Sequence, residues 1–260
     1  TNAIVLAGDE ITFRYEQEAF LPSAKQTSSV PDNFARVRIL YEDKDLCVMD
    51  KPSGMVCHAS HGHYSDSLAH AAVSLLKIPT APSELRCIGR LDKDTSGLVL
   101  FAKNQLSAAR LSRQRENGLL KKEYLALVHH PFSKEVQKGT IRLSMEQIPE
   151  NNSTSFDSSG KRITKMRICP DGQGLFAVTC YEAILQNDSC SVVRCRLETG
   201  RTHQIRLHMA SIGHPLFGDP LYGIRDGGSR AALHAWKLNF LQPITGESIH
   251  LESLRTHMFD

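Results

Sequence analysis

The sequence predicts an α+β fold, a single domain built on a mixed, mostly antiparallel sheet with flanking helices. Short apolar runs with strand character follow one another over most of the chain, and the helical segments are scattered among them. Strict alternation of strand and helix, which would indicate a parallel α/β sheet, is not seen. The length of 260 residues suits one large domain, with at most a small appendage. No internal repeat is visible.

The chain is expected to divide into a leading segment, residues 1–35, and the domain itself, residues 36–260. In the leading segment Pro22 and Pro31 bracket a polar stretch that is typical of a linker. This segment is therefore expected to be a lead-in or the remnant of a further module rather than a domain.

The first half of the domain begins with a strand pair, because apolar runs at 37–40 and 46–49 flank a turn-like stretch. Apolar residues at helical spacing then predict a helix over 66–77, for which Ser65 or Asp66 can serve as the N-cap. A buried strand is expected at 98–101, followed by a second helix from Asn104 to Gly118.

The second half is predicted to consist mainly of strands, at 124–128, 140–143, 175–185 and 192–197, with a loop at 151–160. A short helix is expected over 202–212, where Gly213 ends it. The alternating pattern from His234 to Phe240, a turn and the run 248–251 predict a closing hairpin.

Composition narrows the class of protein. No apolar run reaches the ~18 residues of a membrane span, and the N-terminus lacks a secretion signal pattern. The seven cysteines are odd in number and form no C-x-x-C pair, which argues against a disulfide framework and for a reducing compartment. The expected location is cytoplasmic, and a monomer is the default.

The net charge of +3 is too small to indicate nucleic-acid binding by itself. Basic residues are concentrated in one short stretch. They form either a solvated helix face or a rim that contacts RNA phosphates, and both interpretations stay open. They are Arg110, Arg113, Arg115, Lys121 and Lys122.

Three segments carry candidate chemistry. In 87–101 the carboxylates Asp92 and Asp94 lie in a turn between two apolar runs, where they are either turn formers or a carboxylate presented at the floor of a cleft. In 197–208 two arginines and two histidines follow a strand. They are either the polar start of a helix, or one of the arginines pairs with a buried carboxylate. In 121–128 Tyr124 is either a core residue or a platform for a base.

Together these segments resemble the motifs of RluA-like pseudouridine synthases, in the same order. Residues 90–97 match the family pattern Arg-Leu-Asp-x-x-Thr-Ser-Gly, and residues 199–206 match Thr-Gly-Arg-x-His-Gln-Ile-Arg. Further similarity lies in 50–54, 213–223 and 233–235, so the resemblance covers about residues 36–255. One departure is Gly89, where relatives often carry His.

The resemblance implies a catalytic domain with a central cleft, and an enzyme that isomerises uridines in ribosomal or transfer RNA without a cofactor. It implies that Asp92 is the catalytic carboxylate, that Tyr124 lies against the target base, and that Arg201 pairs with Asp92. It also implies that residues 4–11 are the tail of a small RNA-binding domain. The residues it places near the RNA are Arg90, Thr95, Ser96, Thr202, His203, Gln204 and Arg206.

Several alternatives compete with this interpretation. A metal site is not expected, because the histidines at 58, 61 and 63, at 129 and 130, and at 203 and 208 lack further ligands at familiar spacing. Asp94 and Asp219 are rival carboxylates, although the Gly-Asp-Pro setting of Asp219 indicates a turn. A non-catalytic RNA-binding protein is the second hypothesis. A glycoside hydrolase is the third, and it normally needs two carboxylates.

Overall fold

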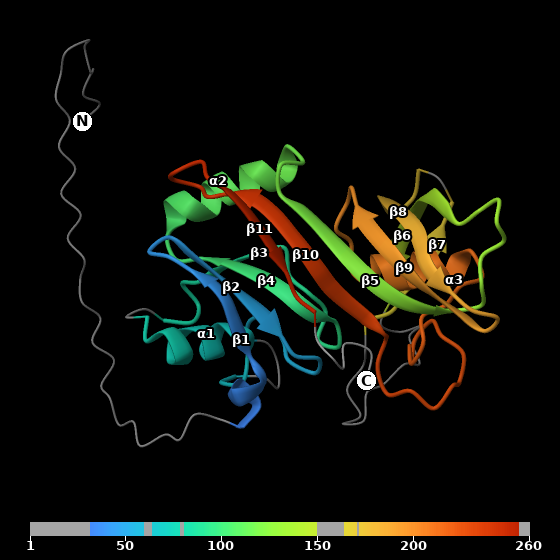
Figure 1. The fold of residues 1–260 in the computed structure, drawn as a ribbon, viewed down its shortest axis with the longest axis horizontal. Coiled ribbons are helices and arrows are strands. Elements are labelled where there is room, and N and C mark those ends of the chain that lie inside the picture. The colour runs from blue at the N-terminus through green and yellow to red at the C-terminus, as the bar shows by residue number, and fades with distance from the viewer. Residues whose placement is uncertain (1–31, 60–63, 79–80, 150–163, 171, 255–260) are drawn as a thin grey trace, which may run out of the picture.

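The computed structural model describes residues 32–59, 64–78, 81–149, 164–170 and 172–254. Within them one sheet runs through the molecule, with helices packed on it (Figure 1). The helices are α1 (Leu68–Leu76), α2 (Gln105–Glu116) and α3 (Gln204–Ser211), and a 3-10 turn spans Asp32–Arg36. The strands are β1 (Arg38–Glu42), β2 (Leu46–Lys51), β3 (Arg86–Ile88), β4 (Ser96–Ala102), β5 (Lys121–His129), β6 (Lys138–Gln147), β7 (Met166–Cys169), β8 (Leu175–Gln186), β9 (Cys190–Leu197), β10 (Leu233–Leu241) and β11 (Ser248–Glu252).

Neighbouring strands follow the order β1-β2-β4-β10-β5-β9-β8-β6-β7, while β3 pairs with β4 and β11 pairs with β10 beside this path. Among the described strands only β4 and β10 pair in parallel, and all other pairs are antiparallel. The predicted α+β class with a mixed, mostly antiparallel sheet is confirmed, as is the closing hairpin of β10 and β11.

Most predicted elements are present, with three corrections. Asn104 caps α2 as expected, since its Oδ1 accepts from the Ser107 amide at 2.8 Å. Helix α1 is capped by Ser67 instead of Ser65 or Asp66, because the chain stays extended through Ser67 and its hydroxyl accepts from the His70 amide. Strands β3 and β7 were not predicted. Each is very short and forms only by pairing with a longer neighbour, so no run of alternating residues marks them.

The core has two faces because β4 is buried along its whole length. Leu98 and Leu100 point to the side that α2 covers through Leu111. Val99 and Phe101 point to the other side, which α1 covers. The alternation of the strand thus places one helix on each side of the same half of the sheet (Figure 1).

The folded core extends slightly upstream of the predicted domain boundary, since Phe34 is 3% exposed and packs in the same cluster as α1. The rest of the predicted lead-in, residues 1–31, and the predicted loop 151–160 lie outside the described residues. None of the described helices is long and apolar enough to cross a membrane.

One row of paired residues crosses four neighbouring strands at the centre of the sheet. Gly97 on β4 faces Ala235 on β10, which faces Tyr124 on β5, which faces Cys195 on β9. Gly97 has a φ of +109°, and a Cβ there would lie 2.3 Å from the Ala235 carbonyl oxygen. Only glycine permits this close approach, which brings the start of β4, and the loop before it, next to β10 and β5.

Candidate active site

Asp92 lies in the loop between β3 and β4, and this loop is held at several points. The Thr95 amide donates to the Asp92 carbonyl at 3.2 Å, so the predicted turn exists. The segment after β2 fixes the rest of the loop: the Gly54 amide donates to the Lys93 carbonyl at 3.0 Å, and Ser53 Oγ donates to the Asp94 carbonyl at 2.8 Å. The backbone on the C-terminal side of Asp92 is therefore anchored to a separate part of the chain.

Lys51 is the central anchor of this arrangement. Its side chain is fully buried, and Nζ donates to the carbonyls of Pro52 at 3.0 Å, Met55 at 2.7 Å and Lys93 at 2.8 Å. Burial lowers the pKa of Lys51 to about 8, although the nearby charges of Cys57, Asp94 and Asp92 act the other way. An ammonium that satisfies three carbonyls in this way joins the end of β2 to the Asp92 loop.

Side chains from three further segments lie within electrostatic range of Asp92, because its charge acts on the pKa of each of them. They are Tyr124 of β5, His203 and Arg206 at the start of α3, and Tyr222 of the segment before β10. Together with Lys51 of β2, these side chains come from distant parts of the sequence. Residues of the second candidate segment, and the tyrosine of the third, thus lie within electrostatic range of a carboxylate in the first.

Tyr124 has both a structural and a site-facing character. Its side chain is 8% exposed and packs in the core cluster with Ala126, Ala235 and Cys195. Burial, and then the charge of Asp92, raises the pKa of its phenol well above the ordinary value. The hydroxyl therefore stays protonated at neutral pH beside the carboxylate.

Arg206 forms a buried ion pair that sequence reasoning missed. Its Nε and Nη2 donate to the two carboxylate oxygens of Asp219 at 2.7 and 2.6 Å, and both side chains are almost entirely buried. Burial opposes the charge of Asp219, but the hydrogen bonds and charge of Arg206 prevail and lower the pKa of that carboxyl group. Oδ1 of Asp219 also accepts from the amides of Leu221 and Tyr222, so the predicted turn is present as well.

His203 and Tyr222 form a linked pair at the start of α3. His203 has a φ of +57°, and its Nδ1 lies 3.0 Å from the Tyr222 hydroxyl. The Tyr222 ring also faces the Arg206 guanidinium, 5.3 Å from the ring centroid. Burial lowers the pKa of His203, although the charge of Asp92 acts the other way.

Gln204 holds the loop that carries Arg201. Its Oε1 accepts from the Arg201 amide at 3.0 Å and from the Thr199 hydroxyl, while its Nε2 donates to Val178 and Thr179 of β8. Arg201 is partly buried, and its Nε donates to the Phe176 carbonyl at 3.3 Å. Among the described ion pairs none joins Arg201 to Asp92, so that pairing stays a prediction.

The other residues expected near the RNA fall into two groups. Arg90 and Thr202 are exposed. Thr95 and Ser96 are each 3% exposed, and Ser96 Oγ lies 2.8 Å from Nδ1 of the buried His234, whose Nε2 lies 3.0 Å from the Ser253 carbonyl. Since an imidazole NH must donate to that carbonyl, Nδ1 accepts from Ser96. Ser96 thus joins β4 to β10 and to the residues after β11.

Sequence reasoning gave no role to Lys51 or Tyr222 and treated Asp219 only as a rival carboxylate in a turn, although all three lie in stretches that match the family pattern. The one available sign in the sequence was a lysine directly before Pro-x-Gly, which could have indicated the role of Lys51. Among the described residues no group of three or more His, Cys, Asp or Glu side chains is placed to hold a metal ion. His61 and His63 lie outside the described residues.

Comparison with known proteins defines the class. A family model described as RNA pseudouridylate synthase matches residues 45–211, more than half of the chain. Two solved human structures share the fold. RNA Pseudouridylate Synthase Domain Containing 1 has a TM-score of 0.64 at 24% identity, covering 87% of this chain and 86% of its own. RNA Pseudouridylate Synthase Domain Containing 4 has a TM-score of 0.62 at 25% identity, covering 85% and 89%.

The chain belongs to the RNA pseudouridylate synthase family and is an RNA pseudouridine synthase, an isomerase. It is 36% identical over 258 residues to the uncharacterized RNA pseudouridine synthase YhcT of Bacillus subtilis, covering 97% of this chain and 77% of the relative. It is also 34% identical over 249 residues to ribosomal large subunit pseudouridine synthase D of Zymomonas mobilis, covering 89% and 72%.

Proposed function

We propose that this enzyme isomerises specific uridines of ribosomal or transfer RNA, with Asp92 as the catalytic carboxylate. The observation that carries the proposal is that Lys51, Tyr124, His203 and Arg206, from three separate segments, all lie within electrostatic range of Asp92. The name of the Zymomonas mobilis relative refers to the large ribosomal subunit, which supports ribosomal RNA as one of the two candidate substrates.

The proposed isomerisation of uridine requires one reactive carboxylate of the protein. The bond between N1 of uracil and the ribose breaks, the base turns, and carbon 5 forms a new bond to the same sugar carbon; carbon 5 loses a proton and N1 gains one from solvent. No group enters or leaves the RNA, so the proposal includes no cofactor. A carboxylate can act as a nucleophile at a glycosidic carbon, as it does in retaining glycosidases. The target uridine must leave the base stack to reach Asp92.

The remaining site residues divide between contact and support. Tyr124 offers the face of its ring to the base, and its hydroxyl relays the carbon-5 proton: the phenol oxygen accepts that proton as it gives up its own to solvent water. Arg90, Thr202 and His203 are proposed to contact the RNA, and Arg201 is proposed to pair with Asp92.

Buried site residues are better suited to support than to direct contact. Arg206 forms hydrogen bonds with Asp219, and Ser96 with His234. Gln204 forms hydrogen bonds with β8 and with the loop that carries Arg201. Thr95, also predicted near the RNA, is buried as well. We propose that these side chains act on the RNA through the loops that they hold.

The proposal is tested by mapping pseudouridine in total RNA from cells that lack the protein, rescued with wild type, Asp92→Asn or Asp94→Asn. Asp94 is the matched control because it is a second carboxylate in the same loop. We expect specific sites to disappear, to return with wild type and with Asp94→Asn, and to stay absent with Asp92→Asn. The identity of those sites assigns the RNA.

Rescue by Asp92→Asn would overturn the catalytic role of Asp92. If the deletion changes no site in any cellular RNA, the alternative of a non-catalytic RNA-binding protein replaces the proposal. The proposal also includes a cytoplasmic location and a monomer, which fractionation of the cells and light scattering of the purified protein test.

A further inference from the structure

We propose that a pocket beside the Asp92 loop, between α1 and β3, binds a nucleotide that flanks the target uridine in the same RNA strand. Arg86 and Arg90 hold its phosphates, and Tyr64 stacks on its base. The inference deepens the proposed function, because it names the part of the substrate that this surface recognises.

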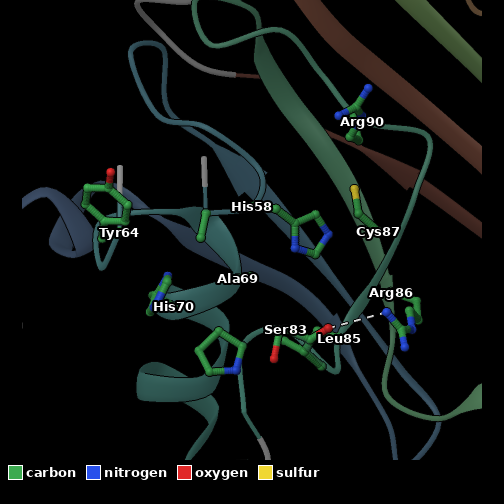
Figure 2. A pocket seen from close by; sticks show the side chains of 11 residues that line it. His58, Tyr64, Ala69, His70, Ser83, Leu85, Arg86, Cys87 and Arg90 are labelled. Atoms are coloured by element: carbon green, nitrogen blue, oxygen red, sulfur yellow. Dashed lines mark hydrogen bonds between the residues drawn. The ribbon is translucent and has the colours of Figure 1, made fainter. Parts of the chain in front are cut away.

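The pocket has a volume of about 510 Å³, within the range of about 300–1,000 Å³ that is usual for small-molecule sites. Figure 2 shows His58 at its centre, with Tyr64 and His70 toward α1 and with Arg86, Cys87 and Arg90 toward β3. Its other lining residues are Ala59, Ala69, Pro82, Ser83 and Leu85. The walls are mostly apolar, and the polar groups lie at the two arginines and the two histidines.

The charges at the pocket favour an anionic ligand. The cationic side chains of Arg86 and Arg90 line it, and none of its described lining residues is Asp or Glu. Burial, and then the charges of Arg90 and Arg86, lowers the pKa of His58, which places both guanidinium groups within electrostatic range of the pocket centre. One opposing charge, that of Asp66, acts on His70.

Arg86 has donors to spare for a phosphate. It is an exposed residue, and Nη1 donates to the Ser83 carbonyl at 3.4 Å, a long contact that is drawn in Figure 2. A guanidinium has five N–H donors in a planar fork that suits two phosphate oxygens. Together with Arg90 it forms a cationic edge of the kind that follows an RNA backbone.

Tyr64 gives the pocket an aromatic surface. It is 74% exposed, the most exposed large hydrophobic side chain among the described residues. A tyrosine in that position gains little from packing, whereas bases of single-stranded RNA stack on such rings. An apolar wall, a cationic edge and an exposed ring together fit a nucleotide better than a free anion.

The pocket is continuous with the proposed catalytic loop. Cys57, next to His58, exchanges hydrogen bonds with Leu91: the Leu91 amide donates to Sγ at 3.4 Å, and Sγ donates to the Leu91 carbonyl at 3.5 Å. Leu91 lies between Arg90, which lines the pocket, and Asp92. Arg90 thus joins the pocket to the proposed catalytic loop, so a nucleotide held there belongs to the strand that carries the target uridine.

The test measures binding of a 5′-fluorescein-labelled oligouridylate of about ten nucleotides by fluorescence anisotropy, over a series of salt concentrations. The variants are Tyr64→Ala, Tyr64→Phe and Arg86→Ala, and the control is Arg142→Ala, an exposed arginine on β6. Since the substituted side chains are exposed, all variants are expected to melt at the wild-type temperature.

Loss of a stacked base weakens binding by roughly 5- to 150-fold, so we expect Tyr64→Ala to weaken it by about fivefold or more. Tyr64→Phe keeps the ring and should stay within about twofold of wild type. Arg86→Ala should lower the slope of log Kd against log salt by about 0.7, the value for one phosphate contact on a single strand. Arg142→Ala should change neither quantity.

Three results would overturn the inference: no binding of the oligouridylate by wild type, unchanged affinity in Tyr64→Ala, or an equal loss in Arg142→Ala. Failure of the proposed function looks different. If Asp92→Asn restores the modified sites in cells while Tyr64→Ala still weakens oligouridylate binding, the pocket stands as an RNA site and only the catalytic role fails. If Asp92 proves essential and Tyr64→Ala binds normally, only the pocket fails.

Discussion

Replacement of Lys51 by methionine tests whether the position of Asp92 depends on a buried anchor. Methionine keeps the length and the apolar stem of the lysine but removes the ammonium group. The carbonyls of Pro52, Met55 and Lys93 then lose their donor, and the Asp92 loop loses its connection to the end of β2. We expect a moderate loss of stability and a larger loss of activity.

The magnitude follows from two opposing terms. Hydrogen bonds from a charged donor contribute about 1.5–3 kcal/mol each, so three of them contribute about 5–9 kcal/mol. Burial lowers the pKa of Lys51 from 10.5 to about 8, which corresponds to a cost of about 3 kcal/mol for the charge. Methionine avoids that cost. The net destabilisation is therefore about 2–6 kcal/mol, or a fall in Tm of roughly 5–25 °C for a domain of this size.

The assay combines thermal unfolding with single-turnover kinetics on an RNA that contains a mapped target uridine. A displacement of about 1 Å at a catalytic group can lower the rate about 100-fold. We expect the rate of pseudouridine formation in Lys51→Met to fall by at least about tenfold while the Kd for the RNA stays near wild type. Ser53→Ala removes only the bond to the Asp94 carbonyl, and it should cost about 1 kcal/mol.

A Lys51→Met protein with the wild-type Tm and rate would refute this reasoning. It would show that the backbone bonds alone, such as the bond from Gly54 to Lys93, hold the loop. A lower Tm with an unchanged rate well below the melting temperature would refute the link to Asp92 but not the stability argument.

Three further predictions concern the fold. Gly97→Ala should cost more than about 4 kcal/mol, because its Cβ would lie 2.3 Å from the Ala235 carbonyl oxygen; a soluble variant with the wild-type Tm contradicts this. Asp219→Ala leaves Arg206 unpaired in the interior and should cost about 3–5 kcal/mol, measured by urea unfolding and contradicted by an unchanged midpoint. Burial lowers the pKa of His208 in α3 to about 4, whereas its pKa in the unfolded chain is about 6.5. Between these two pH values the unfolded chain binds one proton more than the folded protein does. Stability should therefore fall by about 2 kcal/mol, after a discount for solvent screening, as the pH drops through this window. The drop should be smaller in His208→Leu, and equal acid sensitivity of the two proteins would refute the assignment.

Local patterning was enough to predict much of the fold. The helix over 66–77, the cap at Asn104 and the hairpin of β10 and β11 follow from the spacing of apolar residues and from turn chemistry, which act between near neighbours in the chain. Strands β3 and β7 were not predictable in this way, because they exist only through pairing with β4 and β6. The parallel pairing of β4 and β10, which brings the Asp92 loop to the centre, is likewise invisible in either strand alone.

The sequence by itself determined the family, since the motifs around Asp92 and Arg201 are contiguous and each can be seen within a few residues. It could not determine which of the polar side chains in those motifs face a substrate. Ser96, Gln204 and Arg206 stand next to exposed or site-facing residues in the chain, yet their partners are His234, Thr179 and Asp219. Such partners lie between 13 and 138 positions away. Only the folded chain brings them within hydrogen-bonding distance, and that distance decides whether a polar side chain supports the site or contacts the RNA.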